Sequence, residues 1–172
     1  MAAVIWLTGM SGAGKTMLVS ELEQEFVARG QRVQELDGDV VREIFEDDLG
    51  YDRAARIMNV RRIAFAAMML AENGVNALVA NIAPFYEARD FIRRITPVYF
   101  QVYVQAALET LKERDTKGLY GGRTGADVGN VIGVDEVYDT PRNPDLIVDT
   151  DRETVAGTAA RIIERCEAKG LL

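Results

Sequence analysis

The segment at residues 9–16, Gly-Met-Ser-Gly-Ala-Gly-Lys-Thr, has residue types and a spacing that suit the binding of phosphate. The spacing G-x-x-x-x-G-K-T is the P-loop pattern. Its glycines allow backbone N–H groups to surround phosphate oxygens, and the following helix adds a positive N-terminus. Lys15 can reach the β- and γ-phosphates of a nucleotide, and the Thr16 hydroxyl suits Mg²⁺. The alternative is an ordinary glycine-rich turn, which the preceding apolar run at residues 4–7 disfavours.

Two carboxylates, Asp37 and Asp39, flank Gly38 at the end of a second expected strand. There they can hold Mg²⁺ through water or accept the proton of a hydroxyl group. The sequence contains no histidine, so we expect any general base to be a carboxylate. The alternative is an aspartate turn that caps the helix after it. Because a P-loop lies nearby, we favour the functional interpretation.

A group of arginines follows the acidic pair. Arg56 and Asn59 are three residues apart, so they share one face of an expected helix. Together with Arg42 they indicate a polar cleft, and a guanidinium group suits a bidentate grip on phosphate or sulfate. The alternative is a solvated charged face. That alternative is stronger for Arg61 and Arg62, which can pair with acidic neighbours.

Residues 114–120, Arg-Asp-Thr-Lys-Gly-Leu-Tyr, open a glycine-rich stretch that continues to about residue 134. The stretch follows the fourth expected strand, which is where a P-loop kinase would place a lid over its substrates. The spacing alone does not distinguish a lid from a surface loop.

The elements that must position these residues alternate between strand and helix. We expect strands at residues 3–7, 33–36, 76–81, 98–104 and 146–148. We expect helices at residues 14–29, 39–47, 52–73, 86–94, 106–114 and 152–168. The alternation predicts an α/β fold in which helices cover both faces of a five-stranded parallel sheet, formed by one domain, residues 1–172. Binding sites in such sheets lie at the carboxyl ends of the strands.

The composition excludes several other classes of protein. The chain of 172 residues has 20 basic and 27 acidic side chains, a net charge of −7 that argues against binding to nucleic acid or anionic membranes. A single cysteine, Cys166, excludes a disulfide within the chain, and its place on an apolar helix face indicates a packing role. No signal peptide is recognisable and no apolar run approaches the ~18 residues of a membrane span, so we expect a cytoplasmic protein.

Taken together, these stretches resemble the adenylylsulfate kinase (APS kinase) family. The resemblance runs in order through residues 9–16, Leu-Asp-Gly-Asp at 36–39 with Arg42, Asp-Leu-Gly-Tyr at 48–51, Arg56 with Asn-Val-Arg-Arg-Ile at 59–63, residues 114–120, Tyr-Asp-Thr-Pro at 138–141 and Asn-Pro-Asp at 143–145. It implies a three-layer P-loop kinase fold. It also implies transfer of the γ-phosphate of ATP to the 3′-hydroxyl of adenylyl sulfate, which gives 3′-phosphoadenylyl sulfate.

The resemblance further implies roles for individual residues, with ATP and Mg²⁺ as cofactors and a homodimer as the assembly. The implied catalytic residues are Asp39, Lys15 and Asp37, and the implied metal-binding residues are Thr16 and Asp37. The implied ATP-binding residues are Gly9, Ser11, Gly12, Ala13, Gly14, Lys15, Thr16, Met17 and Arg114. The implied acceptor-binding residues are Asp39, Arg42, Tyr51, Arg56, Asn59, Ile82, Ala83, Lys117, Leu119 and Val131. Within these sets, Arg114 resembles a wall of the ATP adenine pocket, and Lys117 lies in the lid.

The sequence departs from the family pattern on the acceptor side. Ala83 stands where the family commonly has a serine, so the phosphoserine form of some relatives is excluded at that position. Val131 stands where the family has a phenylalanine that forms half of an aromatic sandwich on the substrate adenine, and Tyr51 stands for the phenylalanine of the other half. Stacking on an aromatic side chain is worth ~1–3 kcal/mol per base in nucleic-acid binders. Because Val131 lacks an aromatic ring for this stacking, the sequence leaves open which acceptor the protein phosphorylates.

Two alternatives to adenylylsulfate kinase activity follow. The first is a related kinase for another nucleotide-linked acceptor, such as a cytidine-diphosphoramidate-type compound in polysaccharide modification. The second is a nucleotide-binding domain without catalytic activity, against which the intact Lys15, Thr16 and Asp39 count.

Overall fold

Five parallel strands form the central sheet of this protein in a computed structural model, which describes residues 2–46, 48–115, 118–120 and 130–172. The strands are β1 (Val4–Thr8), β2 (Val33–Asp37), β3 (Asn76–Ala80), β4 (Tyr99–Gln105) and β5 (Leu146–Asp149). They lie in the order β2-β3-β1-β4-β5, and every neighbouring pair is parallel. The predicted five-stranded parallel sheet is confirmed.

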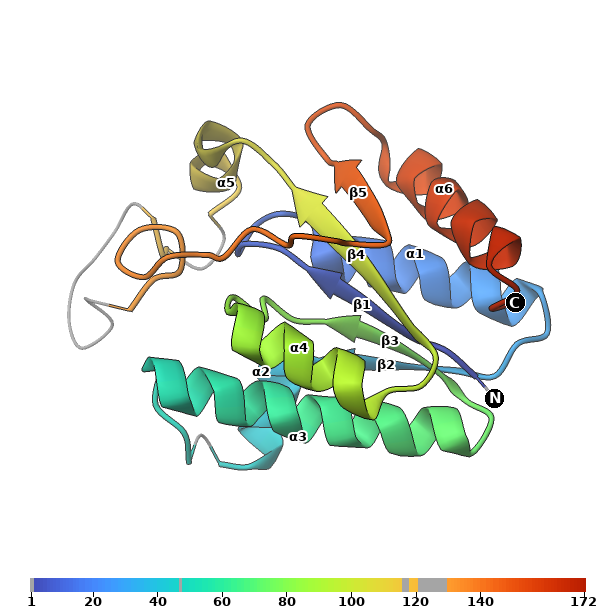
Figure 1. The fold of residues 1–172 in the computed structure, drawn as a ribbon. Helices are drawn as coiled ribbons and strands as arrows, with labels where there is room; N and C mark the ends of the chain where they lie inside the picture. Colours follow the sequence, from blue (N-terminus) through green and yellow to red (C-terminus); the bar gives the residue numbers. More distant parts are fainter. Residues whose placement is uncertain (1, 47, 116–117, 121–129) are drawn as a thin grey trace.

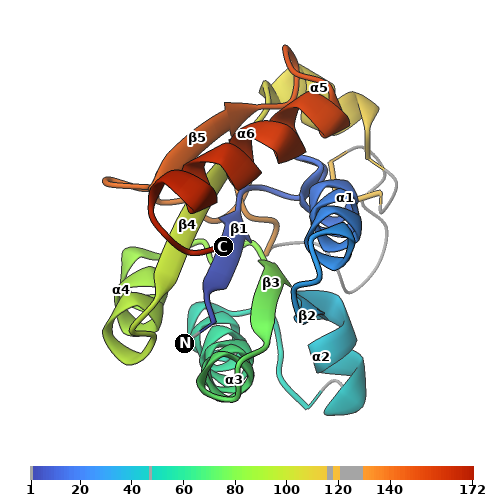
Figure 2. The same ribbon diagram turned by 90° about the vertical axis from the view of Figure 1, so that its right-hand side faces the viewer.

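Helices cover both faces of the sheet (Figure 1). The helices are α1 (Lys15–Ala28), α2 (Gly38–Ile44), α3 (Arg53–Glu72), α4 (Tyr86–Ile95), α5 (Leu108–Glu113) and α6 (Val155–Ala168). Figure 2 shows α1 and α6 on one side of the sheet and α3 and α4 on the other. The predicted three-layer arrangement is therefore also confirmed.

The first strand shows how the sequence creates two cores. Alternate residues of a strand point to opposite faces. Ile5 and Leu7 pack in the cluster with α1 and α6, whereas Val4 and Trp6 pack in the cluster with α3 and α4. All residues of β1 are buried, which explains why this strand reads as a continuous apolar run.

The strand order decides where the P-loop lies. β1 occupies the middle of the sheet, between β3 and β4. The loop from β1 to α1 and the loop from β3 to α4 therefore leave neighbouring strands for opposite faces. In parallel sheets, the crevice for ligands forms at such a switch point.

The helix ends follow the sequence signals closely. Gly30 and Gly74 come one residue after the C-caps of α1 and α3 and have φ of +69° and +73°, which favours glycine. The last helix begins at Val155 and not at the expected residue 152, because the side chain of Thr154 caps it by accepting the N–H of Gly157. Two other bounds also differ from expectation: α2 ends at Ile44 and not at residue 47, and α5 begins at Leu108 and not at residue 106.

Cys166 is fully buried in the cluster that contains α1 and α6, so its predicted packing role is confirmed. Burial raises the pKa of this thiol to about 12, which keeps it protonated at neutral pH. Among the described residues, no helix combines the length and the apolar character that a membrane span requires.

Candidate active site

A cavity of about 1040 Å³ opens at the carboxyl edge of the sheet. Its volume lies just above the range typical of small-molecule sites, about 300–1,000 Å³. It brings together most of the site residues expected from the sequence: Ser11, Gly12, Gly14, Lys15, Thr16, Met17, Asp37, Asp39, Arg42, Tyr51, Arg56, Asn59, Ile82, Ala83, Arg114, Leu119 and Val131. Gly9 and Ala13 belong to the P-loop but are not among its lining residues. Lys117 lies outside the described residues.

The P-loop backbone requires glycine at its first and last glycine positions. A Cβ on Gly9 would lie 2.2 Å from the carbonyl oxygen of Val104, and Gly14 has φ of +94°. Gly14 is the N-cap residue of α1, and no described side chain caps this helix. The start of α1 therefore suits a bound anion.

Lys15 adds a positive charge to this loop. Its Nζ donates hydrogen bonds of 2.8 Å to the carbonyl oxygens of Gly9 and Met10. These contacts fold the side chain back across the loop. The uncapped helix start and this ammonium group together fit a bound phosphate.

Asp37 caps α2 and also faces the P-loop. Its Oδ1 accepts the backbone N–H of Asp39 at 2.7 Å and thereby caps α2. Its Oδ2 lies 3.4 Å from the Thr16 hydroxyl, which donates to it. The cap orients the carboxylate, so that its second oxygen points toward the P-loop.

The donor set around Thr16 and Asp37 fits Mg²⁺. A hydroxyl and a carboxylate oxygen are hard ligands of the kind that Mg²⁺ prefers. The described residues include no group of three or more acidic, histidine or cysteine side chains that would form an all-protein metal cage. Mg²⁺ fits such a sparse set because it usually retains waters and binds substrate phosphates.

Arg42 and Arg56 both lie close to Tyr51 in the wall of the cavity. Arg42 is 8% exposed and donates to the carbonyl oxygens of Leu49 and Gly50 at 3.0 and 3.1 Å. Arg56 donates through Nε to the carbonyl oxygen of Tyr51 at 2.8 Å. The Cζ atoms of Arg42 and Arg56 lie 4.6 and 5.5 Å from the centroid of the Tyr51 ring. The arginines therefore fix the aromatic residue as well as concentrating positive charge.

The charges of the two arginines influence each other. Burial lowers the pKa of Arg56, and the positive charge of Arg42 lowers it further. The same proximity makes this end of the cavity attractive to an anion, because a bound negative charge would relieve the repulsion. Arg56 also donates to the carbonyl oxygen of Asn130 at 2.6 Å, which connects α3 to the segment before Val131.

Asn59 lines the cavity and carries a buried polar atom without a partner among the described residues. The residue is 4% exposed, and its Nδ2 donates to the carbonyl oxygen of Gly38 at 3.3 Å. Its Oδ1 has no hydrogen-bond partner among the described residues. A buried carbonyl-type oxygen without a partner is costly, so this atom fits a ligand that donates a hydrogen bond.

Arg61 and Arg62, the other two arginines of the sequence pattern, are not among the cavity-lining residues. Arg62 forms a two-pronged ion pair with Asp48, with both contacts at 2.7 Å, and Arg61 lies 3.9 Å from Glu87. The expectation that these two pair with acidic neighbours is confirmed.

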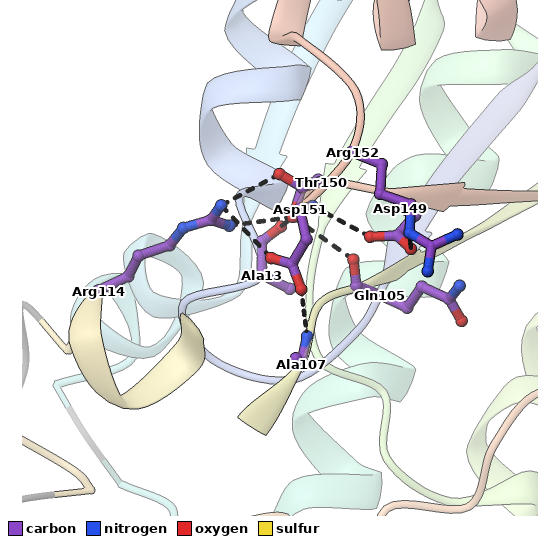
Figure 3. A network of polar contacts seen from close by, with 8 residues as sticks. All are labelled: Ala13, Gln105, Ala107, Arg114, Asp149, Thr150, Asp151 and Arg152. Atoms are coloured by element: carbon purple, nitrogen blue, oxygen red, sulfur yellow. Dashed lines mark hydrogen bonds and ion pairs between the residues drawn. The ribbon is translucent and has the colours of Figure 1, made fainter. Parts of the chain in front are cut away.

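Thr150 is a cavity residue that the sequence motifs do not identify. Its hydroxyl donates to the carbonyl oxygen of Ala13 at 3.0 Å, and Arg114 donates to both its hydroxyl and its carbonyl oxygen at 3.0 Å (Figure 3). Arg114 also forms an ion pair of 3.6 Å with Asp151, whose other oxygen accepts the N–H of Ala107. The one sequence signal was the position of Thr150 directly after the last strand, at the carboxyl edge.

Comparisons with known proteins agree with this geometry. The sequence profile of the adenylylsulphate kinase family matches residues 1–149. An adenylyl-sulfate kinase from Halothermothrix orenii is 41% identical over 168 residues, which cover 98% of this chain and 91% of the relative. One from Deinococcus deserti is 44% identical over 161 residues, or 94% and 89% of the two chains.

A solved structure agrees over nearly the same length. The structure of a Mycobacterium tuberculosis APS kinase in complex with AMPPNP and APS matches this chain with a TM-score of 0.90 and 32% identity. The match covers 96% of this chain and 98% of the other. The fold is thus the P-loop kinase fold that the resemblance implied. This chain belongs to the adenylylsulphate kinase family.

Proposed function

We propose that this protein transfers the γ-phosphate of ATP to the 3′-hydroxyl of adenylyl sulfate and so produces 3′-phosphoadenylyl sulfate. One observation carries the proposal: a single cavity joins a P-loop, an acidic pair and an arginine-flanked aromatic residue. The P-loop end suits the triphosphate donor, and the end around Tyr51 suits a purine nucleotide with an anionic group. Membership in the adenylylsulphate kinase family supports the same pairing of substrates.

On the donor side, the chain binds and orients the triphosphate. The backbone N–H groups at the start of α1 and the ammonium group of Lys15 hold the β- and γ-phosphate oxygens and stabilise the charge that spreads over them during transfer. Thr16 and Asp37 would hold Mg²⁺, which supplies further neutralisation of the phosphate charge when bound. Arg114 forms a wall of the adenine site, and Thr150 and Asp151 fix its guanidinium group.

On the acceptor side, Asp39 orients the 3′-hydroxyl and accepts its proton as the new P–O bond forms. Arg42 and Arg56 bind the anionic group, and the ring of Tyr51 packs on the adenine. The Oδ1 atom of Asn59 accepts a hydrogen bond from the substrate. The lid expected from the sequence at residues 117–134 lies largely outside the described residues.

A second candidate is a kinase for a different nucleotide-linked acceptor. Two observations favour it: Ala83 and Val131 both line the cavity, at positions where the resemblance implies a serine and a phenylalanine. A smaller aliphatic wall offers less stacking area to a purine and accommodates a different base. Cytidine-linked acceptors are the natural first test.

The deciding experiment is a coupled ATP-turnover assay with Mg²⁺. Adenylyl sulfate and cytidine-linked nucleotides are compared as acceptors, and Lys15→Ala serves as the inactive control. Saturable turnover at micromolar adenylyl sulfate supports the first proposal. Turnover with a cytidine-linked acceptor alone supports the second candidate. ATP binding without turnover of any acceptor supports a non-catalytic nucleotide-binding domain.

Two further expectations from the sequence stay predictions. Sedimentation equilibrium tests the homodimer, because a single species at twice the monomer mass of 19.0 kDa is expected. Cell fractionation tests the cytoplasmic location.

A further inference from the structure

The loop between β3 and α4 adopts a conformation that its sequence does not favour. Ala83 has φ of +40°, in the left-handed region where the Cβ of an ordinary residue is crowded. Non-glycine residues in this region persist only where the surrounding structure enforces it, and they concentrate at functional sites. Ala83 is fully buried and lines the cavity. Something in the fold must therefore hold it.

Arg89 of α4 makes the contact that holds Ala83. This arginine is 5% exposed, and its Nη1 donates to the carbonyl oxygen of Ala83 at 2.6 Å. Its Nη2 donates to the carbonyl oxygen of Asp139, on a segment 50 residues farther along the chain. The guanidinium carbon lies 5.2 and 5.6 Å from the ring centroids of Tyr86 and Tyr138. The planar guanidinium group of Arg89 thus joins two loops, and two aromatic rings fix its position.

Asn81 and Thr8 also hold the loop between β3 and α4 in place. The side chain of Asn81 accepts the N–H of Ala83 at 2.9 Å, so both backbone polar groups of this alanine are bound. The hydroxyl of Thr8, at the end of β1, donates to the carbonyl oxygen of Ile82 at 2.6 Å. The loop is therefore held from β1, from its own asparagine and from α4.

The loop between β3 and α4 packs against α2, the helix that carries Asp39. A Cβ on Gly38 would lie only 2.1 Å from Nδ2 of Asn81, so the asparagine packs directly against the start of α2. The carbonyl oxygen of Gly38 also accepts a hydrogen bond from Asn59. A shift of Asn81 would therefore also displace the acidic pair, Asp37 and Asp39, and Asn59.

We propose that Arg89 is a positioning residue for the acceptor site. By binding the carbonyl oxygen of Ala83, it keeps this residue in the left-handed conformation. It thereby sets the positions of Ile82 and Asn81 in the cavity wall. This inference rests on the proposed function for the identity of the acceptor, but the loop geometry it describes does not depend on it.

The test is Arg89→Lys. Lysine keeps the positive charge but lacks the planar fork, so it cannot bind both carbonyl oxygens in the same way. The KM for adenylyl sulfate is expected to rise about tenfold or more, since small misplacements of binding groups are costly, while the KM for ATP stays unchanged. The matched control is Arg93→Lys on the same helix, because Arg93 is half-exposed and is not among the cavity-lining residues.

Ala83→Gly provides a rescue experiment. Glycine adopts positive φ without crowding, so it needs less help from Arg89. In the double variant Arg89→Lys/Ala83→Gly, the KM for adenylyl sulfate is expected to fall from the value of Arg89→Lys most of the way to that of Ala83→Gly alone. A purely structural role of Arg89 would lower the melting temperature without this selective recovery. If Arg89→Lys does not fold, Asn81→Ala removes the other backbone contact of Ala83 and must produce the same acceptor-selective rise.

Hydrogen exchange separates this inference from the proposed function. The Ala83 amide is expected to exchange at least about tenfold faster in Arg89→Lys, while amides in α1 keep their protection. This measurement needs no substrate, so it stands even if the wild-type protein does not turn over adenylyl sulfate. Equal increases in both KM values, or unchanged exchange at Ala83, would overturn the positioning role.

Discussion

The hydroxyl of Tyr120 donates a hydrogen bond of 2.9 Å to the carbonyl oxygen of Ser11, 109 residues earlier in the chain. The backbone of Tyr120 is itself fixed, because the carboxylate of Asp115 accepts the N–H groups of Leu119 and Tyr120 at 2.8 and 2.7 Å. Leu119 lines the cavity. The turn that presents Leu119 is therefore anchored to the P-loop.

Tyr120→Phe is expected to weaken ATP binding. The change removes one hydrogen bond, which typically contributes about 0.5–1.5 kcal/mol, and leaves the Ser11 carbonyl to water. We expect the KM for ATP to rise about two- to tenfold, as steady-state kinetics would show. Tyr99→Phe is the matched control, because Tyr99 lies at the start of β4 and is not among the cavity-lining residues. An unchanged KM for ATP in Tyr120→Phe would contradict the anchoring role.

Val131→Phe is expected to improve the binding of adenylyl sulfate. Val131 lines the cavity and is 8% exposed, so a ring there adds a stacking face for a base. Stacking worth about 1 kcal/mol corresponds to a roughly fivefold lower KM for adenylyl sulfate, with the KM for ATP unchanged. Val134→Phe is the control because Val134 is exposed outside the cavity. A higher KM for adenylyl sulfate would indicate that the valine wall serves another acceptor.

Asp39→Asn is expected to reduce turnover far more than ATP affinity. An amide cannot accept the proton of the acceptor hydroxyl, and general-base catalysis typically contributes about 10²–10⁴-fold. Single-turnover kinetics and ATP titration measure the two effects separately. Asp52→Asn is the control: Asp52 caps α3 by accepting the N–H of Ala55 at 2.9 Å, and asparagine caps a helix about equally well, so turnover and stability are both expected to stay near the wild-type values. Near-normal turnover in Asp39→Asn would refute the assignment of the base.

Thr150→Val is expected to raise the KM for ATP. The substitution preserves the shape of the side chain but removes the hydroxyl that joins Arg114 to the Ala13 carbonyl. A loss of about 1–2 kcal/mol would raise this KM roughly five- to thirtyfold. Thr96→Val is the control, since its buried hydroxyl has no partner among the described residues. That variant is expected to be neutral or more stable, and equal KM values in both variants would contradict the role of Thr150.

The pair between Arg62 and Asp48 predicts a dependence of stability on pH. The hydrogen bonds from Arg62 lower the pKa of Asp48 below its ordinary value of 3.8. The pair therefore contributes stability above pH 3.8 that is lost as the pH falls through the lower, folded-state pKa. Arg62→Gln should return the Asp48 pKa toward its ordinary value in an NMR titration and reduce the acid-side loss of stability. Arg61→Gln should do neither, because Arg61 lies near Glu87 instead.

Local patterns were sufficient for the elements and the motifs. The apolar run of β1, the 3.6-residue rhythm of α3 and the glycines after the helices each express preferences over a few residues. The rule that sites lie at the carboxyl edge then located the P-loop and the acidic pair together. For Asp37 the sequence leaves a helix cap and a functional role open, and the structure shows that one oxygen caps α2 while the other faces Thr16.

The sequence by itself thus determined the order of strands and helices along the chain, the phosphate-binding loop and the candidate acid–base residues. All of these depend on spacing within short segments. The tertiary structure alone decided that Thr150 meets Ala13, that Tyr120 meets Ser11 and that Arg89 holds Ala83 at a positive φ. Each of these contacts requires segments to meet that lie apart in the chain. Their meeting is fixed by the strand order β2-β3-β1-β4-β5 and by packing between layers, which no local pattern encodes.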